Sequence, residues 1–176
     1  MELLLDISQL SPDSRVLDVG CGIGGTARFL AKHLHCTVTG ITISSRQVDL
    51  ARKLTRDEAG KSTQEHDGDD FIALGQGKVR FIELDAEKMG EYFGHGSDDA
   101  AQFDCVWISE AMSHLPDKAL FFGNATRVLK PGGKLVVADW FKGEGLTQSQ
   151  LDADIKPIEG TGLTLASFLP SVSLMN

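Results

Sequence analysis

In Asp18-Val19-Gly20-Cys21-Gly22-Ile23-Gly24-Gly25, the chain passes from a short apolar segment into a turn that contains four glycines. Val16 and Leu17 before the turn are typical of a buried strand, and residues 27–34 after it have the pattern of a helix. A strand, a glycine turn and a helix in this order let the backbone approach a nucleotide closely. We therefore expect a nucleotide-like cofactor at this turn, next to the carboxylate of Asp18.

Strands and helices alternate along the rest of the chain. The apolar segments predict strands at residues 15–19, 36–43, 78–84, 103–108 and 134–138. The helical patterns lie at residues 3–10, 27–34, from Ser44-Ser45 to about residue 54, and 116–129. This alternation predicts an α/β fold: a Rossmann-like, doubly wound, mostly parallel sheet of about five strands with helices on both faces. We assign residues 1–141 to this domain and expect residues 142–176 to form an irregular tail.

The composition restricts the classes of partner. The 176 residues suffice for one domain, and the net charge of −8 argues against a nucleic-acid binder, which needs a basic surface. Three cysteines without a C-x-x-C pair indicate a reduced, cytoplasmic protein. His33 and His35 lack further nearby ligands, so we expect no metal site. No segment approaches the roughly 18 apolar residues of a membrane span. A small-molecule partner is the remaining expectation.

The glycine pattern alone is compatible with a dinucleotide. Gly20, Gly22 and Gly25 satisfy G-x-G-x-x-G. A nicotinamide site also needs an acid at the end of the second strand, about 20 residues further on. Residues 40–44 contain no acid there, although Arg46 could serve an NADP site. An NADP-dependent reductase therefore stays open at this point.

Asp18 favours a different cofactor. S-adenosylmethionine carries an ammonium and a sulfonium group and no phosphate, so a carboxylate beside the turn suits it. A phosphate site gains nothing from an acid in that place. The alternative for Asp18 is a carboxylate that stabilises the turn by accepting hydrogen bonds from its N–H groups.

Three segments resemble, in this order along the chain, motifs of class I S-adenosylmethionine-dependent methyltransferases. They are the glycine motif at Val16–Gly25, the second strand at Val38–Ser44, and the helix end and turn at Arg127–Gly133. The variants Gly40-Ile41-Thr42 and Ser113–Lys118 are most similar to the tocopherol and sterol C-methyltransferase branch. The resemblance covers residues 15–140.

The resemblance implies which residues hold the cofactor, S-adenosylmethionine. The methionine end would lie at the glycine turn, against Asp18, Gly20, Cys21, Gly22 and Gly24. The ribose would lie at Thr42, Ser44 and Gln47, and Thr42 stands where the family usually has an acid. The adenine would lie at Asp85 and Ala86, and Ser109 would line the cofactor's edge. Asp85 also fits a plain helix N-cap before Glu87.

Methyl transfer mainly requires that the protein align the acceptor with the methyl group and exclude water. A base is needed where the acceptor must lose a proton. Glu110 and His114 follow the predicted strand 103–108, at the edge where such sheets bind ligands, so we predict that they contact the acceptor or transfer a proton. The alternative is a capping glutamate and a packed histidine. Asp139 and Trp140 could form another wall of the pocket, although Trp140 fits the core equally well.

In the family that the chain resembles, the complete domain continues past the fifth strand with a helix and two more strands. Residues 142–176 do not predict them. We therefore expect a truncated methyltransferase that acts on a small lipid or phenolic acceptor. The alternatives are a non-catalytic cofactor-binding remnant and, more distantly, an NADP-dependent reductase. The open edge of strand 134–138 also predicts self-association.

Overall fold

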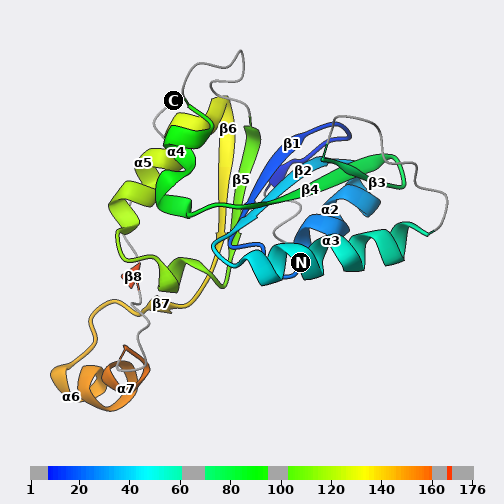
Figure 1. The fold of residues 1–176 in the computed structure, drawn as a ribbon. Helices are drawn as coiled ribbons and strands as arrows, with labels where there is room; N and C mark the ends of the chain where they lie inside the picture. Colours follow the sequence, from blue (N-terminus) through cyan, green and yellow to red (C-terminus); the bar gives the residue numbers. More distant parts are fainter. Residues whose placement is uncertain (1–7, 61–69, 95–102, 160–165, 168–176) are drawn as a thin grey trace.

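The computed structural model describes residues 8–60, 70–94, 103–159 and 166–167. Within them, one six-stranded sheet has the order β3-β4-β2-β1-β5-β6. Its strands are β1 (Arg15–Val19), β2 (Thr37–Thr42), β3 (Ile72–Leu74), β4 (Gly77–Glu83), β5 (Phe103–Ser109) and β6 (Leu129–Ala138). The helices beside it are α2 (Gly25–Leu34), α3 (Ser45–Ala59), α4 (Met89–Tyr92) and α5 (Lys118–Val128), with 3-10 turns η1 (Ala86–Lys88) and η2 (Met112–His114). Figure 1 shows α2 and α3 on one face of the sheet, and α4 and α5 on the other.

The predicted doubly wound sheet is confirmed, with one strand more than expected. β4, β2, β1, β5 and β6 run parallel, and β3 is antiparallel to β4. β3 has three residues, which are too few to produce a strand periodicity in the sequence. In this pair, Ile72 lies opposite Val79 and Leu74 lies opposite Gly77. A tight turn joins the two strands, and Gly75 in it has a φ of 68°.

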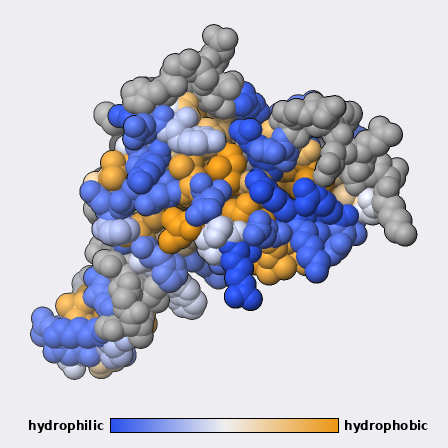
Figure 2. All heavy atoms as spheres, in the orientation of Figure 1, coloured by the Kyte–Doolittle hydropathy of each residue, from blue (hydrophilic) through white to orange (hydrophobic). Residues whose placement is uncertain are grey.

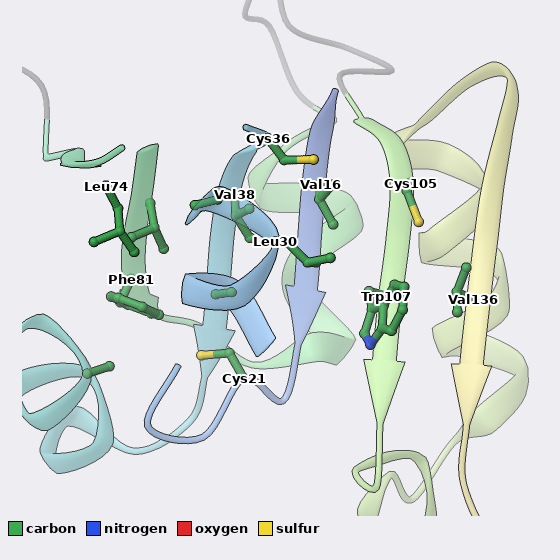
Figure 3. Close-up of a cluster of buried hydrophobic side chains, with 14 of the residues drawn as sticks. Val16, Cys21, Leu30, Cys36, Val38, Leu74, Phe81, Cys105, Trp107 and Val136 are labelled. Atoms are coloured by element: carbon green, nitrogen blue, oxygen red, sulfur yellow. The ribbon is translucent and has the colours of Figure 1, made fainter. Parts of the chain in front are cut away.

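Each face of the sheet has its own apolar core, because side chains alternate along a strand. On β1, Val16 belongs to the cluster beneath α2 and α3, while Leu17 and Val19 belong to the cluster beneath α4 and α5. Figure 3 shows the first cluster, in which Trp107 and Phe81 are the largest side chains. Both faces of the central strands β1, β2 and β5 are buried, and the polar side chains of Asp18, Thr39 and Thr42 are buried with them.

Two predicted boundaries are corrected. The helix predicted from residue 116 begins at Lys118, because Asp117 is its N-cap and accepts a hydrogen bond from the N–H of Leu120 at 2.8 Å. The strand predicted at 134–138 begins at Leu129, which pairs with Phe103 before a register shift. The helix predicted at residues 3–10 lies mostly outside the described residues.

The residues after the sheet differ from the irregular tail that the sequence predicted. β7 (Phe141–Lys142) pairs with β8 (Ala166–Ser167), and residues 148–159 form consecutive helical turns, α6 (Gln148–Gln150), η3 (Leu151–Ile155) and α7 (Lys156–Glu159). Local interactions explain the helical turns. Thr147 and Gln150 form a capping box, and Lys156 lies 2.6 Å from Asp152 one turn earlier. A domain boundary near residue 141 stays a prediction.

β6 forms one edge of the sheet among the described strands. Self-association through that edge stays a prediction. None of the described helices is long and apolar enough to cross a membrane. The described residues likewise contain no group of three potential metal-ligating side chains.

Candidate functional site

The glycine turn joins the end of β1 to the start of α2 and is held against β2. The N–H groups of Gly20 and Cys21 both donate to the carbonyl oxygen of Ile41, at 3.0 Å each. Gly20, Gly22 and Gly24 have φ values of 71°, 54° and 78°, a backbone conformation that side chains with a Cβ rarely adopt. The turn is therefore fixed in shape before any ligand arrives.

Close packing explains two of these glycines, and open space surrounds the third. A Cβ at Gly20 would lie 2.4 Å from the Cβ of Ala111, and one at Gly24 would lie 2.4 Å from the Phe81 ring. A Cβ at Gly22 would meet nothing within 4 Å. The backbone at Gly22 is thus accessible to a ligand, whereas Gly20 and Gly24 are needed for packing as well as for the turn.

Asp18 is a buried acid with an incomplete set of hydrogen bonds. The residue is only 2% exposed, and its Oδ2 atom has no hydrogen-bond partner. Burial raises the pKa of Asp18 from its ordinary 3.8 to about 7, although a hydrogen bond from the backbone N–H of Ala27 lowers it. A buried acceptor without a partner is rare and calls for an explanation, and a cationic ligand group at the glycine turn would provide one.

The predicted alternative for Asp18, stabilisation of the turn, accounts for part of its environment. The Ala27 N–H belongs to the first turn of α2, so this bond does tie Asp18 to the segment after the glycines. It leaves Oδ2 unexplained.

Cys21 serves as a small packed residue in the turn. Its Sγ atom would lie 2.9 Å from a Cβ at Gly40, so the two positions share one tight space. Burial and the neighbouring Asp18 raise the pKa of the Cys21 thiol far above its ordinary value. The thiol is therefore neutral, and the structure favours packing over a nucleophilic role.

The three residues expected at the ribose form one hydrogen-bonded group after β2. The Thr42 hydroxyl donates to Oε1 of Gln47 at 2.6 Å and accepts from the N–H of Ser44 at 3.3 Å. The Ser44 hydroxyl accepts from the N–H of Gln47 at 3.3 Å and caps α3. The structure thus brings Thr42, Ser44 and Gln47 together through one bond between side chains and two bonds from backbone N–H groups.

Ile43 was missed by the sequence reasoning. It lies between Thr42 and Ser44 and is 74% exposed, which is unusual for a large apolar residue directly after a buried strand. Ile23 in the glycine turn is also exposed. The feature of the sequence that could have identified Ile43 is its position at the carboxyl end of a strand, where ligands bind in sheets of this kind. Figure 2 shows hydrophobic residues gathered in the middle of the visible face, between α4–α5 and α3.

Asp85 and Ala86 follow β4 and lie at the same edge as Thr42. The N–H of Leu84 donates to the carbonyl oxygen of Thr42 at 2.9 Å, which fixes the two strand ends beside each other. Asp85 is the N-cap of η1, since its Oδ1 atom accepts from the N–H of Glu87 at 2.9 Å. The plain capping role is therefore present, and the second carboxylate oxygen remains for a ligand. Ala86 is buried.

Ser109, Glu110 and His114 lie at the end of β5. Ser109 is the last residue of the strand and pairs with Ala138. Glu110 is exposed and has a φ of 53°, a strained value for a residue with a side chain. His114 is also exposed, and Ala111 rather than Glu110 is the N-cap of η2. The alternative of a capping glutamate and a packed histidine is wrong.

Asp139 holds this loop in place. Its Oδ2 atom accepts hydrogen bonds from the N–H groups of Met112 at 2.7 Å and Ser113 at 3.4 Å, and its Oδ1 atom accepts from the N–H of Trp140 at 2.8 Å. Asp139 thus links the end of β6 to η2 and positions His114. Trp140 is 73% exposed, so the core position considered for it is wrong.

A separate hollow lies near the amino end of β5 and is remote from the glycine turn. Its lining includes Ser8, Asp104, Lys130 and Lys134. Asp104 pairs with Lys130 at 2.7 Å and accepts from the backbone N–H of Arg15 at 2.8 Å. Asp104 and Lys130 are thus paired with each other, and Nζ of Lys134 donates to Oε1 of Gln9 at 2.6 Å, so the hollow is no rival to the carboxyl edge.

Comparison with known proteins identifies the family of the chain. A family model described as a methyltransferase domain matches residues 17–137, from β1 to the end of β6. The 2-methyl-6-phytyl-1,4-hydroquinone methyltransferase of Synechocystis is 45% identical over 134 residues, which cover 76% of this chain and 34% of that protein. The chloroplastic tocopherol O-methyltransferase of Arabidopsis thaliana is 35% identical over 126 residues, covering 72% of this chain and 30% of that protein. The chain thus spans about a third of the length of these relatives.

Solved structures confirm the fold. The geranyl diphosphate C-methyltransferase of Streptomyces coelicolor superimposes with a TM-score of 0.69 at 19% identity, covering 94% of this chain and 54% of that one. The family model leaves the reductase hypothesis without support. The chain belongs to the methyltransferase-domain family, near its tocopherol and sterol methyltransferase branch.

Proposed function

We propose that this chain binds S-adenosylmethionine and supplies the cofactor-binding part of a methyltransferase for a prenylated quinol or a related small lipid. The observation that carries the proposal is the buried Oδ2 atom of Asp18, which lacks a partner directly behind an open glycine turn. The names of the relatives supply the acceptor class.

The methionine end of the cofactor would bind at the glycine turn. Asp18 offers an acceptor for the ammonium group, and the backbone at Gly20 and Gly22 offers a surface without side chains. A charge-assisted hydrogen bond to Asp18 would relieve the cost of burying that carboxylate.

The nucleoside end would bind along the ends of β2 and β4. The Thr42–Ser44–Gln47 group offers polar atoms to the ribose, in place of the acid that a nicotinamide site would need. The exposed side chain of Ile43 offers an apolar surface to a flat base. Asp85 and the N–H of Ala86 would hold the polar edge of the adenine, and Ser109 would line the cofactor's edge.

Glu110 and His114 are the proposed acceptor-side residues. Bound cofactor would supply an electrophilic methyl group, and the protein's task is then to align the acceptor and keep water away. Both side chains are exposed at the same edge as the glycine turn, and Asp139 fixes the loop between them. Either could take a proton from a phenolic acceptor.

Isothermal calorimetry of the purified chain with S-adenosylhomocysteine and with NADP tests the cofactor. We expect binding of S-adenosylhomocysteine and none of NADP. The Gly22→Val variant, which fills the open side of the turn, should lose the binding. Binding of NADP alone would overturn the proposal.

A methyl-transfer assay with prenylated hydroquinones, tocopherols and sterols tests the activity. Transfer to one class identifies the acceptor. Binding of S-adenosylhomocysteine without transfer to any of them would instead favour the non-catalytic cofactor-binding alternative.

A further inference from the structure

Two buried polar atoms without a partner lie on neighbouring strands. They are Oδ2 of Asp18 on β1 and Nε1 of Trp107 on β5. Asp18 is 2% exposed and Trp107 is 0% exposed, so bulk water does not reach either side chain freely. The two residues are direct register partners in the parallel β1–β5 pair.

Both side chains are on the face of the sheet that α2 covers. Val16, two residues before Asp18, and Trp107 itself belong to the apolar cluster beneath α2. Adjacent strands lie about 4.8 Å apart, so register partners on one face are close neighbours. Figure 3 shows the Trp107 ring with its nitrogen directed toward the carboxyl end of the sheet, on the side that faces β1.

The two atoms are chemically complementary. An indole N–H can only donate a hydrogen bond, and an ionised carboxylate can only accept one. A donor and an acceptor that are both buried and unpaired destabilise a fold, and one bond between them removes both costs.

The other groups around Asp18 do not offer this bond. The Ala27 N–H on α2 already donates to the carboxylate, and Gly40, its register partner on β2, has no side chain. The thiols of Cys21 in the turn and Cys105 on β5 interact electrostatically with Asp18. Burial raises the pKa of both thiols, to about 12 for Cys105, so both are neutral near pH 7 and are weak donors.

We propose that Trp107 is a positioning residue of the cofactor site, whose indole N–H reaches Oδ2 of Asp18 through one buried water, since neither atom has a direct partner, and favours the ionised carboxylate. This proposal rests on the proposed role of Asp18 in binding the cofactor's ammonium group. In it, Trp107 touches no substrate. It acts by opposing the rise in the pKa of Asp18 that burial causes.

Tryptophan fluorescence tests the contact without any cofactor. The chain has two tryptophans, so the Trp140→Phe variant, excited at wavelengths that tyrosine does not absorb, leaves Trp107 as the only emitter. Its emission should change between pH 5 and pH 9 with a midpoint near 7, and the added Asp18→Asn change should abolish that transition. A transition that persists unchanged in the double variant, or none in the single variant, would overturn the proposal.

Cofactor affinity then tests whether the contact between Trp107 and Asp18 affects cofactor binding. In the Trp107→Phe variant, the pH midpoint of S-adenosylhomocysteine binding should move upward by about one unit, with about fivefold weaker binding at pH 7. Phe121→Leu, in the core on the opposite face, is the packing control and should lower thermal stability without moving the midpoint. Equal weakening at every pH in Trp107→Phe would mean that Trp107 only packs.

The two experiments separate this proposal from the proposed function. If the unmodified chain does not bind S-adenosylhomocysteine, the proposed function fails, and the fluorescence titration still decides whether Trp107 and Asp18 are coupled. If the chain binds and neither experiment shows coupling, only the inference about Trp107 fails.

Discussion

The two sides of the carboxyl edge are built differently. On the β1–β2 side, the glycine turn is pinned by hydrogen bonds to Ile41, and the acid behind it is buried. On the β5–β6 side, Glu110, His114 and Trp140 are exposed, and one residue, Asp139, holds their loop. The cofactor side is therefore preorganised by its own packing. The acceptor side consists of exposed side chains on a tethered loop, so changes there should affect transfer more than cofactor binding.

The largest effect is expected from crowding the preorganised side. Gly20→Ala places a Cβ 2.4 Å from that of Ala111 in a backbone conformation that alanine resists. We expect a loss of about 3 kcal/mol in the free energy of unfolding and no measurable binding of S-adenosylhomocysteine. Urea unfolding and calorimetry measure both.

Gly25→Ala is the matched control for this prediction. A Cβ at Gly25 meets nothing within 4 Å, and the residue is the first of α2. Stability should change by less than about 1 kcal/mol. Equal losses in the two variants would contradict the packing explanation.

The next effect concerns the charge behind the turn. The pKa of Asp18 is raised in the folded chain to about 7, so between about pH 4 and pH 7 the native state holds a proton that the unfolded state has lost. Stability without cofactor should therefore fall as the pH rises through this window, by on the order of 2–4 kcal/mol. Thermal unfolding from pH 4 to pH 8 measures the slope.

Asp18→Asn should flatten that slope, since the group no longer titrates. Cofactor affinity should follow the opposite trend in the unmodified chain and weaken below pH 7, because the carboxylate becomes neutral. A stability profile that is the same in both proteins would show that Asp18 does not titrate in this range.

A smaller effect is expected on the tethered side. Asp139→Ala removes the acceptor of the Met112 and Ser113 N–H groups and should reduce stability by about 1–2 kcal/mol. Methyl transfer should fall at least tenfold while S-adenosylhomocysteine binds within about threefold of normal, since the glycine turn is untouched. Thr147→Ala, which removes the N-cap of α6, is a control that should leave methyl transfer and S-adenosylhomocysteine binding unchanged. A parallel loss of binding and transfer would show that the two sides are not independent.

The smallest effect is expected at the ribose position. Thr42→Val keeps the shape of the side chain and removes its 2.6 Å bond to Gln47. S-adenosylhomocysteine should bind about three- to tenfold more weakly, because Gln47 loses its orientation. Thr39→Val on the same strand, β2, removes a buried hydroxyl that accepts a hydrogen bond from Arg80 on β4, and it should affect stability alone. Similar affinity losses in both variants would point to a general effect of β2.

Much of the fold was predictable from local patterns. The strand and helix segments around the glycine turn are long and strongly apolar, and their alternation permits few topologies. β3 was not predictable, because three residues form a strand only where β4 offers an edge. The helical turns at 148–159 were missed for the opposite reason: their signals are a capping box and one ion pair rather than an apolar face.

The residues of the candidate site were likewise predictable only in part. Residues next to the glycines, or directly after a strand, could be found because each strand of a parallel sheet ends at the same edge. The roles of Ile43, Asp139 and Trp107 could not, since each depends on exposure or on a partner far away in the chain.

The glycine turn, the alternation of strands and helices, and the family resemblance follow from the amino-acid sequence, because they depend on residues that are neighbours in the chain. Three features depend on the folded arrangement: Oδ2 of Asp18 lacks a partner, Trp107 is the register partner of Asp18, and Asp139 ties β6 to the loop of His114. The physical reason is strand register. It joins residues that no local pattern connects, and it is set by packing across the whole sheet.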